Sequence, residues 1–153
     1  MNEIFLRYTV YMHYYTTGHS VYYHKYHIVW VCKYRRKILK PGVCVYITKL
    51  LHGLLRSMPG VELEEIGFDL DHLHMVMLIP PKYSVSSVVG QLKSQSASRL
   101  RRKFDWISKV YWKENIIWSP GYFSTTIGAD EKTIKQYVER QGQQDSGQQQ
   151  VLL

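Results

Sequence analysis

The chain has 153 residues, of which 45% are hydrophobic and 21% charged, so the composition excludes wholesale disorder and indicates one domain of ordinary size. Lysine and arginine outnumber aspartate and glutamate by 20 to 12, and the net charge of +8 favours a polyanionic partner, either nucleic acid or an anionic membrane surface. Two cysteines are too few for a disulfide scaffold, and no apolar run approaches the ~18 residues of a membrane span. We therefore expect a soluble cytoplasmic protein.

The first half of the chain predicts a strand followed by a helix. Residues 1–19 show no clear period and are interpreted as an N-terminal extension. The run from Ser20 to Lys33 is rich in β-branched and aromatic residues, which predicts one long strand. From Val43 to Met58, apolar residues recur at steps of three and four between two Pro-Gly pairs, which predicts an amphipathic helix.

Two strands and a basic helix follow. Alternating residues predict a strand over Val61–Phe68 and another over His72–Ile79, which ends at a pair of prolines. Ser84 or Ser86 is a suitable N-cap for a second helix. The other faces of this helix carry lysines and arginines, so we expect it to be amphipathic and cationic.

The last part of the chain predicts one more strand and a closing helix. Residues 105–115 are interpreted as an irregular connection, and Ile116–Thr126 as a strand or a hairpin. Asp130 is a suitable N-cap for a helix over Glu131–Gln141. Residues 143–153 are rich in glutamine and are expected to be disordered.

The order strand, helix, strand, strand, helix, strand is the split βαβ pattern of ferredoxin-like domains. It predicts an α+β, RRM-like sandwich over residues 20–142, with helices on one face of an antiparallel sheet and an added C-terminal helix. This fold hosts many functions, so the function has to be argued from the site.

His72-Leu73-His74 lies on a predicted strand, where side chains two positions apart project from the same face with their Cα atoms about 7 Å apart. Two imidazoles in this arrangement can converge on one metal ion. The pattern alone is also compatible with two half-exposed histidines that bind nothing, because such pairs arise by chance.

Tyr137 and Gln141 lie four residues apart on the predicted last helix and therefore share one of its faces. Taken alone, Tyr137 also fits an ordinary core tyrosine and Gln141 a polar residue at a helix end.

Together, these features resemble the single-tyrosine transposases of the HUH nuclease superfamily, which move small prokaryotic insertion sequences as single-stranded DNA. The resemblance covers residues 20–141. It rests on the segments YHIVWVCKYRRKIL, DHLHMVMLIPPKYSVSSVVGQLKSQSASRL, WSPGYFSTTIG and TIKQYVERQ, in this order.

The resemblance implies a role for each of these residues. His72 and His74 would bind a divalent metal, Gln141 would complete its coordination, and Tyr137 would be the nucleophile. It also implies a homodimer that exchanges the C-terminal helix, so that the histidines of one subunit act with the tyrosine of the other. Mg²⁺ or Mn²⁺ suits two imidazoles and an amide oxygen, although histidine would also accept Zn²⁺.

Tyrosine is a covalent nucleophile suited to phosphodiesters, and its attack would leave a 5′-phosphotyrosine and a free 3′-hydroxyl. The residue types do not identify a general base.

Two clusters of positive charge are candidate DNA contacts. One follows the first strand and the other lies on the second helix. The predicted contacts are Arg35, Arg36, Lys37, Lys93, Arg99 and Arg102, with Arg101 and Lys103 beside them. Several of the 13 tyrosines and four tryptophans, among them Tyr34, Trp30 and Trp118, are candidate stacking surfaces for unpaired bases.

The leading hypothesis is a DNA transposase that cleaves and joins single strands at the hairpin-bearing ends of an insertion sequence. The alternatives are a domesticated relative that processes palindromes, and an inactive module that only binds single-stranded nucleic acid. The target sequence, the hairpin and the preferred metal are not readable from the sequence.

Overall fold

The computed structural model describes residues 15–16, 21–22 and 24–128. The chain divides into two units, residues 1–23 with 128–153, and residues 24–127. In the first unit the described residues form strands β1 (Tyr15–Thr16) and β2 (Val21–Tyr22), which pair antiparallel. All other described elements belong to the second unit.

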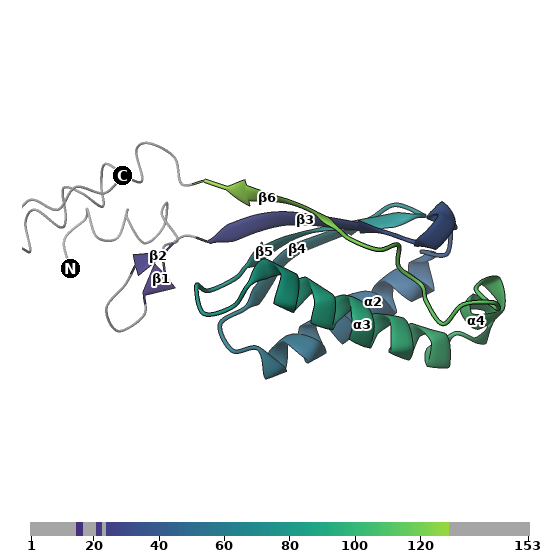
Figure 1. Ribbon diagram of the computed structural model, residues 1–153. Coiled ribbons are helices and arrows are strands. Elements are labelled where there is room, and N and C mark those ends of the chain that lie inside the picture. The colour runs from purple at the N-terminus through teal and green to yellow at the C-terminus, as the bar shows by residue number, and fades with distance from the viewer. Residues whose placement is uncertain (1–14, 17–20, 23, 129–153) are drawn as a thin grey trace, which may run out of the picture. The chain divides into compact units, whose positions relative to one another are not determined.

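The second unit is built on a four-stranded sheet in the order β4-β5-β3-β6, with every neighbouring pair antiparallel. The strands are β3 (Lys25–Val31), β4 (Glu62–Phe68), β5 (His72–Leu78) and β6 (Phe123–Ile127). Helices α2 (Pro41–Leu54) and α3 (Val85–Lys103) cover one face (Figure 1). This confirms the predicted ferredoxin-like α+β fold.

The core lies between the sheet and its two helices. On β5, Leu73, Met75 and Met77 are fully buried or nearly so, because alternate side chains of a strand point to the same face. On β3, Ile28 and Trp30 point into the same layer. The residues between these positions therefore project from the sheet face that the helices leave open.

Helix α2 begins at Pro41, two residues before the predicted start at Val43. Proline is favoured at the first helical position, because an N–H group there has no hydrogen-bond acceptor within the helix and its absence costs nothing. The helix continues into a 3-10 turn, Leu55–Ser57 (η2), close to the predicted end. Helix α3 begins after Ser84, whose hydroxyl accepts a hydrogen bond from the Ser87 N–H at 3.1 Å, so Ser84 rather than Ser86 is the N-cap.

Three element predictions were wrong in detail. The expected strand Ser20–Lys33 is two separate strands, β2 and β3, and β1 lies within residues 1–19, where no element was expected. Residues 105–115, expected to be irregular, contain helix α4 (Asp105–Val110), which is held by the buried side chain of Ile107. Of the two alternatives predicted for Ile116–Thr126, the strand is confirmed, although it is shorter: β6 begins at Phe123 and ends at Ile127.

The predicted final helix, Glu131–Gln141, and the glutamine-rich tail lie outside the described residues. Among the helices that are described, none combines the length and hydrophobicity needed to cross a membrane.

Candidate active site

His72 and His74 project from the open face of the sheet, opposite the helix layer. Leu73 between them is completely buried, whereas His74 is exposed and 29% of the His72 side chain is accessible. The strand therefore brings both imidazoles to one face, as the two-residue period predicts.

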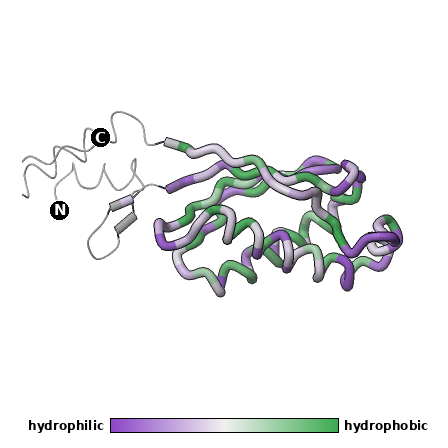
Figure 2. The backbone as a smooth tube through the Cα atoms, in the orientation of Figure 1, coloured by the Kyte–Doolittle hydropathy of each residue, from purple (hydrophilic) through white to green (hydrophobic). Residues whose placement is uncertain are grey.

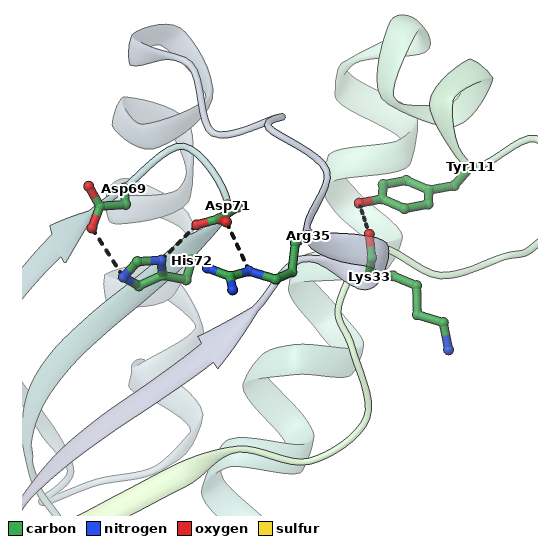
Figure 3. Close-up of polar contacts among 6 residues, drawn as sticks. All are labelled: Lys33, Arg35, Asp69, Asp71, His72 and Tyr111. Carbon is green, nitrogen blue, oxygen red and sulfur yellow. Dashed lines mark hydrogen bonds and ion pairs between the residues drawn. The ribbon is translucent and has the colours of Figure 1, made fainter.

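The turn between β4 and β5 places one carboxylate beside each ring nitrogen of His72 (Figure 3). An Asp71 oxygen lies 2.8 Å from His72 Nδ1, and an Asp69 oxygen lies 3.1 Å from His72 Nε2. The Asp69 N–H also donates to the His72 carbonyl at 2.9 Å, which closes the turn. The sequence pattern marked the two histidines but did not identify either aspartate as a partner of His72.

Asp71 in turn accepts a hydrogen bond from Arg35, whose Nε lies 3.1 Å from the second carboxylate oxygen. The hydrogen bond with His72, together with the positive charge of Arg35, holds the pKa of the Asp71 carboxyl below its ordinary value. The carboxylate thus lies between a guanidinium and an imidazole, and it remains ionised at neutral pH.

Arg35 reaches Asp71 because of an unusual turn after β3. The 3-10 turn Lys33–Arg35 (η1) contains Tyr34 at φ 57° and Arg35 at φ 50°, both in the left-handed region that residues other than glycine seldom adopt. The Tyr111 hydroxyl donates to the Lys33 carbonyl at 2.9 Å and holds this turn from the side of α4 (Figure 3). Backbone strain at such positions is a common feature of functional sites.

The His74 ring has a third histidine beside it. His27 of β3 meets His74 edge to face, with ring centroids 5.9 Å apart. Strand pairing places His27 diagonally across from His74, since His74 pairs with Val29. A single sequence does not reveal this register, so His27 was not among the predicted site residues.

Two imidazoles on one sheet face, with a carboxylate beside one of them, are donor types that a divalent metal ion accepts. A carboxylate on Nδ1, as Asp71 provides, fixes an imidazole so that Nε2 is free to bind a metal. The Nε2 atom of His72 here faces Asp69, so a metal ion would displace that carboxylate or share it. Within the described residues no three His, Cys, Asp or Glu side chains form a metal cluster. The predicted third ligand, Gln141, and the predicted nucleophile, Tyr137, lie outside those residues.

Five of the six predicted DNA contacts, all except Lys93, fall in two places at one end of the second unit. Arg36 and Lys37 are exposed beside Arg35 in the turn after β3, and Arg99 and Arg102 are exposed near the end of α3. Figure 1 places the end of β3, the start of β5 and the end of α3 at this same end, where hydrophilic residues line the turns (Figure 2). The α3 cluster belongs to the helix layer, so it does not share the open sheet face with the histidines.

Lys93 has a structural role that the sequence did not reveal. Its ammonium donates to the carbonyls of Ser119 at 2.7 Å and Gly121 at 2.6 Å, and so ties α3 to the segment that leads into β6. Burial lowers the pKa of Lys93, because it disfavours the charged form. The DNA contact predicted for Lys93 remains a prediction. It would have to use the third N–H of the ammonium, since the other two donate to the Ser119 and Gly121 carbonyls.

The aromatic side chains divide into core and surface groups. Trp30 and Trp118 are buried and pack edge to face with centroids 5.8 Å apart, so they are unavailable for stacking on bases in this structure. Tyr34 is exposed, and so is Trp112, which was not among the predicted stacking surfaces. Tyr34 and Trp112 line an open pocket of about 260 Å³ together with Arg36 and Lys113.

Known proteins resemble the chain over most of its length. A family model described as Transposase IS200 like matches residues 20–141. The transposase for insertion sequence element IS200 of Salmonella typhimurium is 34% identical over 121 residues, which cover 79% of this chain and 78% of the relative. The ISDra2 transposase TnpA of Deinococcus radiodurans is 27% identical over 122 residues, covering 79% and 86%.

Solved structures agree with these sequence matches. A crystal structure described as a transposase from Deinococcus radiodurans superposes with a TM-score of 0.65 at 26% identity, and covers 83% of this chain and 98% of that one. A REP-associated tyrosine transposase bound to a REP hairpin has the same fold, with a TM-score of 0.51 at 15% identity over 87% and 76% of the two chains. The chain belongs to the IS200-like transposase family.

Proposed function

We propose that this transposase cleaves and rejoins single-stranded DNA through a covalent intermediate on Tyr137. The observation that carries the proposal is the pair His72 and His74 on the open sheet face, with Asp71 orienting His72 at the start of β5. The family match ends at Gln141, so it includes both Tyr137 and the proposed third metal ligand.

The proposed reaction is a transesterification. The Tyr137 phenol loses its proton and its oxygen attacks the phosphorus, while the bond from phosphorus to the 3′-oxygen breaks and that oxygen takes up a proton. The products are a 5′-phosphotyrosine and a free 3′-hydroxyl. Attack by another 3′-hydroxyl then releases Tyr137 and seals a strand without ATP.

A phenol with an ordinary pKa near 10 is weakly nucleophilic at neutral pH, so the reaction requires activation. A divalent ion held by His72, His74 and Gln141 would polarise the phosphate and offset the charge that develops on it. Mg²⁺ and Mn²⁺ suit this mixed nitrogen and oxygen donor set. In this arrangement Asp71 holds the His72 ring, and Arg35 holds Asp71.

The DNA surface we propose starts at the turn after β3. Arg35, Arg36 and Lys37 would contact phosphates next to the histidines, and Tyr34 and Trp112 would offer stacking surfaces to unpaired bases. Arg99 and Arg102 would extend this surface along the end of α3. The relative solved with a REP hairpin supports a hairpin as the ligand, which we propose for this chain as well.

Two inactive variants test the proposed site. Tyr137→Phe should yield no covalent adduct on single strands from the DNA that flanks the gene, and His74→Ala should cleave none with Mg²⁺ or Mn²⁺. EDTA should abolish cleavage by the wild-type protein. Tyr83→Phe is the matched control, because Tyr83 lies beyond the other end of β5 and its hydroxyl bonds only to the Pro59 carbonyl among the described residues.

Mixing the two variants tests the proposed dimer. If each site combines the histidines of one subunit with Tyr137 of the other, the mixture should regain part of the activity that each variant lacks. No recovery after subunit exchange would contradict the exchanged helix. Binding of DNA by the wild-type protein with no adduct under any metal would favour the inactive binding module instead.

A further inference from the structure

Gly67 lies directly beside His74 in the sheet. The two residues are paired across β4 and β5, and both face the open side. A Cβ atom added to Gly67 would lie 2.4 Å from His74 Cε1, 2.4 Å from Nε2 and 3.3 Å from Nδ1. The imidazole therefore occupies the space that a side chain at position 67 would fill.

Backbone conformation does not explain this glycine. The described glycines with positive φ are Gly60 and Gly121, so Gly67 has an ordinary extended backbone that any residue adopts. Glycine in a strand interior weakens the strand and often marks a close approach of another group. Gly42, Gly53 and Gly90 have no atom within 4 Å of the added Cβ, whereas at Gly67 the approaching group is the His74 ring.

The other neighbouring strand provides a second contact. His27 on β3 meets the His74 ring edge to face at 5.9 Å. The ring thus lies between Gly67 on one side and His27 on the other, although His74 itself is exposed. An exposed side chain in such surroundings loses rotamer freedom before any ligand arrives.

We propose that Gly67 is a positioning residue for His74, which it allows to lie flat across β4 in the orientation that binds the metal. This inference rests on the proposed function, in which His74 is a metal ligand. Because Cε1 and Nε2 are the ring atoms nearest the added Cβ, even a methyl group would push away the edge that carries the coordinating nitrogen.

The test is Gly67→Ala, with two readouts that do not depend on catalysis. NMR of the ring nitrogens and protons should show a shift of the His74 resonances, which His74→Ala identifies by their loss. Titration with Mn²⁺ alone, followed by EPR, should show an affinity about 10 to 100 times weaker, the usual loss when the surroundings of a metal ligand are disturbed. Gly90→Ala is the control, because the added methyl contacts nothing, and both readouts should match the wild type.

A double variant separates positioning from a general effect on folding. If the clash with the ring is the cause, Gly67→Ala should lower the melting temperature of the wild type but raise it or leave it unchanged in a His74→Ala background. Alanine is otherwise at least as favourable as glycine in a strand. Loss of folding in both backgrounds would overturn the proposal.

Unchanged His74 resonances and Mn²⁺ affinity in Gly67→Ala would also overturn the proposal. If instead His74→Ala leaves Mn²⁺ binding unchanged, the metal assignment is wrong. In that case the NMR shifts and the melting temperatures still decide whether Gly67 positions the ring.

Discussion

At the scale of single residues, the site depends on Asp71. Its carboxylate joins Arg35 to His72 through contacts of 3.1 and 2.8 Å, and the strained turn after β3 makes the first of these contacts possible. The placement of the two histidines on one face can be predicted from the sequence, because alternate residues of a strand point to the same side. The roles of Asp71, His27 and Gly67 cannot, because they depend on a turn geometry and a strand register that only the folded chain defines.

Asp71→Asn should lower the rate of metal-dependent cleavage about 10- to 100-fold, since the amide is neutral and no longer fixes the His72 tautomer. The fold should persist, because asparagine has nearly the same size and shape as aspartate and keeps the backbone carbonyl that accepts the Cys32 N–H at 2.8 Å. Initial rates with Mn²⁺ measure the effect. Asp105→Asn is the matched control, as Asp105 pairs only with exposed Lys109 among the described residues. Equal rates for both variants would refute the role of Asp71.

Lys93→Met should destabilise the fold by about 1–3 kcal/mol, because two carbonyls lose a charged donor. Urea unfolding measures this loss, and Lys109→Met, which removes an exposed charge, should change the stability much less. Normal stability with weakened DNA binding would show instead that Lys93 acts mainly on phosphate.

At the scale of elements, the sequence pattern predicted β4, β5, α2 and α3 closely. Strand β5 and helices α2 and α3 each bury an apolar face, and the partly buried Leu63, Ile66 and Phe68 of β4 pack against the core. The pattern missed α4, since a helix of six residues with one buried side chain, Ile107, has no recognisable period. The sequence also predicted β2 and β3 as one strand, because residues of high β propensity run throughout Ser20–Lys33. Propensity does not show where the pairing between strands changes.

Ser84→Ala should destabilise the protein by about 1 kcal/mol, because the first turn of α3 loses its side-chain cap. Ser86→Ala is the matched comparison, because the exposed Ser86 hydroxyl lies 3.3 Å from the Ser84 hydroxyl but is not the N-cap, so its loss should have a smaller effect. Thermal unfolding of the two variants compares them directly. An equal loss for both would contradict the assignment of Ser84 as the cap.

At the scale of the whole molecule, the net charge of +8 has a structural correlate. Cationic side chains of the β3 turn and of the end of α3 gather at the end of the second unit where β5 begins. Composition predicted a polyanionic partner, and family membership makes that partner DNA. Sequence alone did not show that Lys93 is tied to the backbone, or that Trp106 and Trp112 are exposed whereas Trp30 and Trp118 are buried.

Replacing both Arg36 and Lys37 by alanine should weaken binding of single-stranded DNA and make it less sensitive to salt. Each phosphate contact that is lost should reduce the slope of log K against log salt by about 0.7. Affinities measured between low and moderate salt test this. Replacing Lys109 alone should leave the slope unchanged, and an unchanged slope in the double variant would exclude the β3 turn from the DNA surface.

The proposed reaction is a covalent attack by Tyr137 that leaves a 5′-phosphotyrosine. It is tested most directly with one single-stranded substrate labelled at either its 5′ or its 3′ end, incubated with protein and Mn²⁺ and separated on a denaturing gel. We expect the 3′ label to migrate with the protein, the 5′ label to migrate as a shorter free strand, and Tyr137→Phe to give neither. A 5′ label that migrates with the protein, or an adduct that persists in Tyr137→Phe, would contradict the proposed reaction.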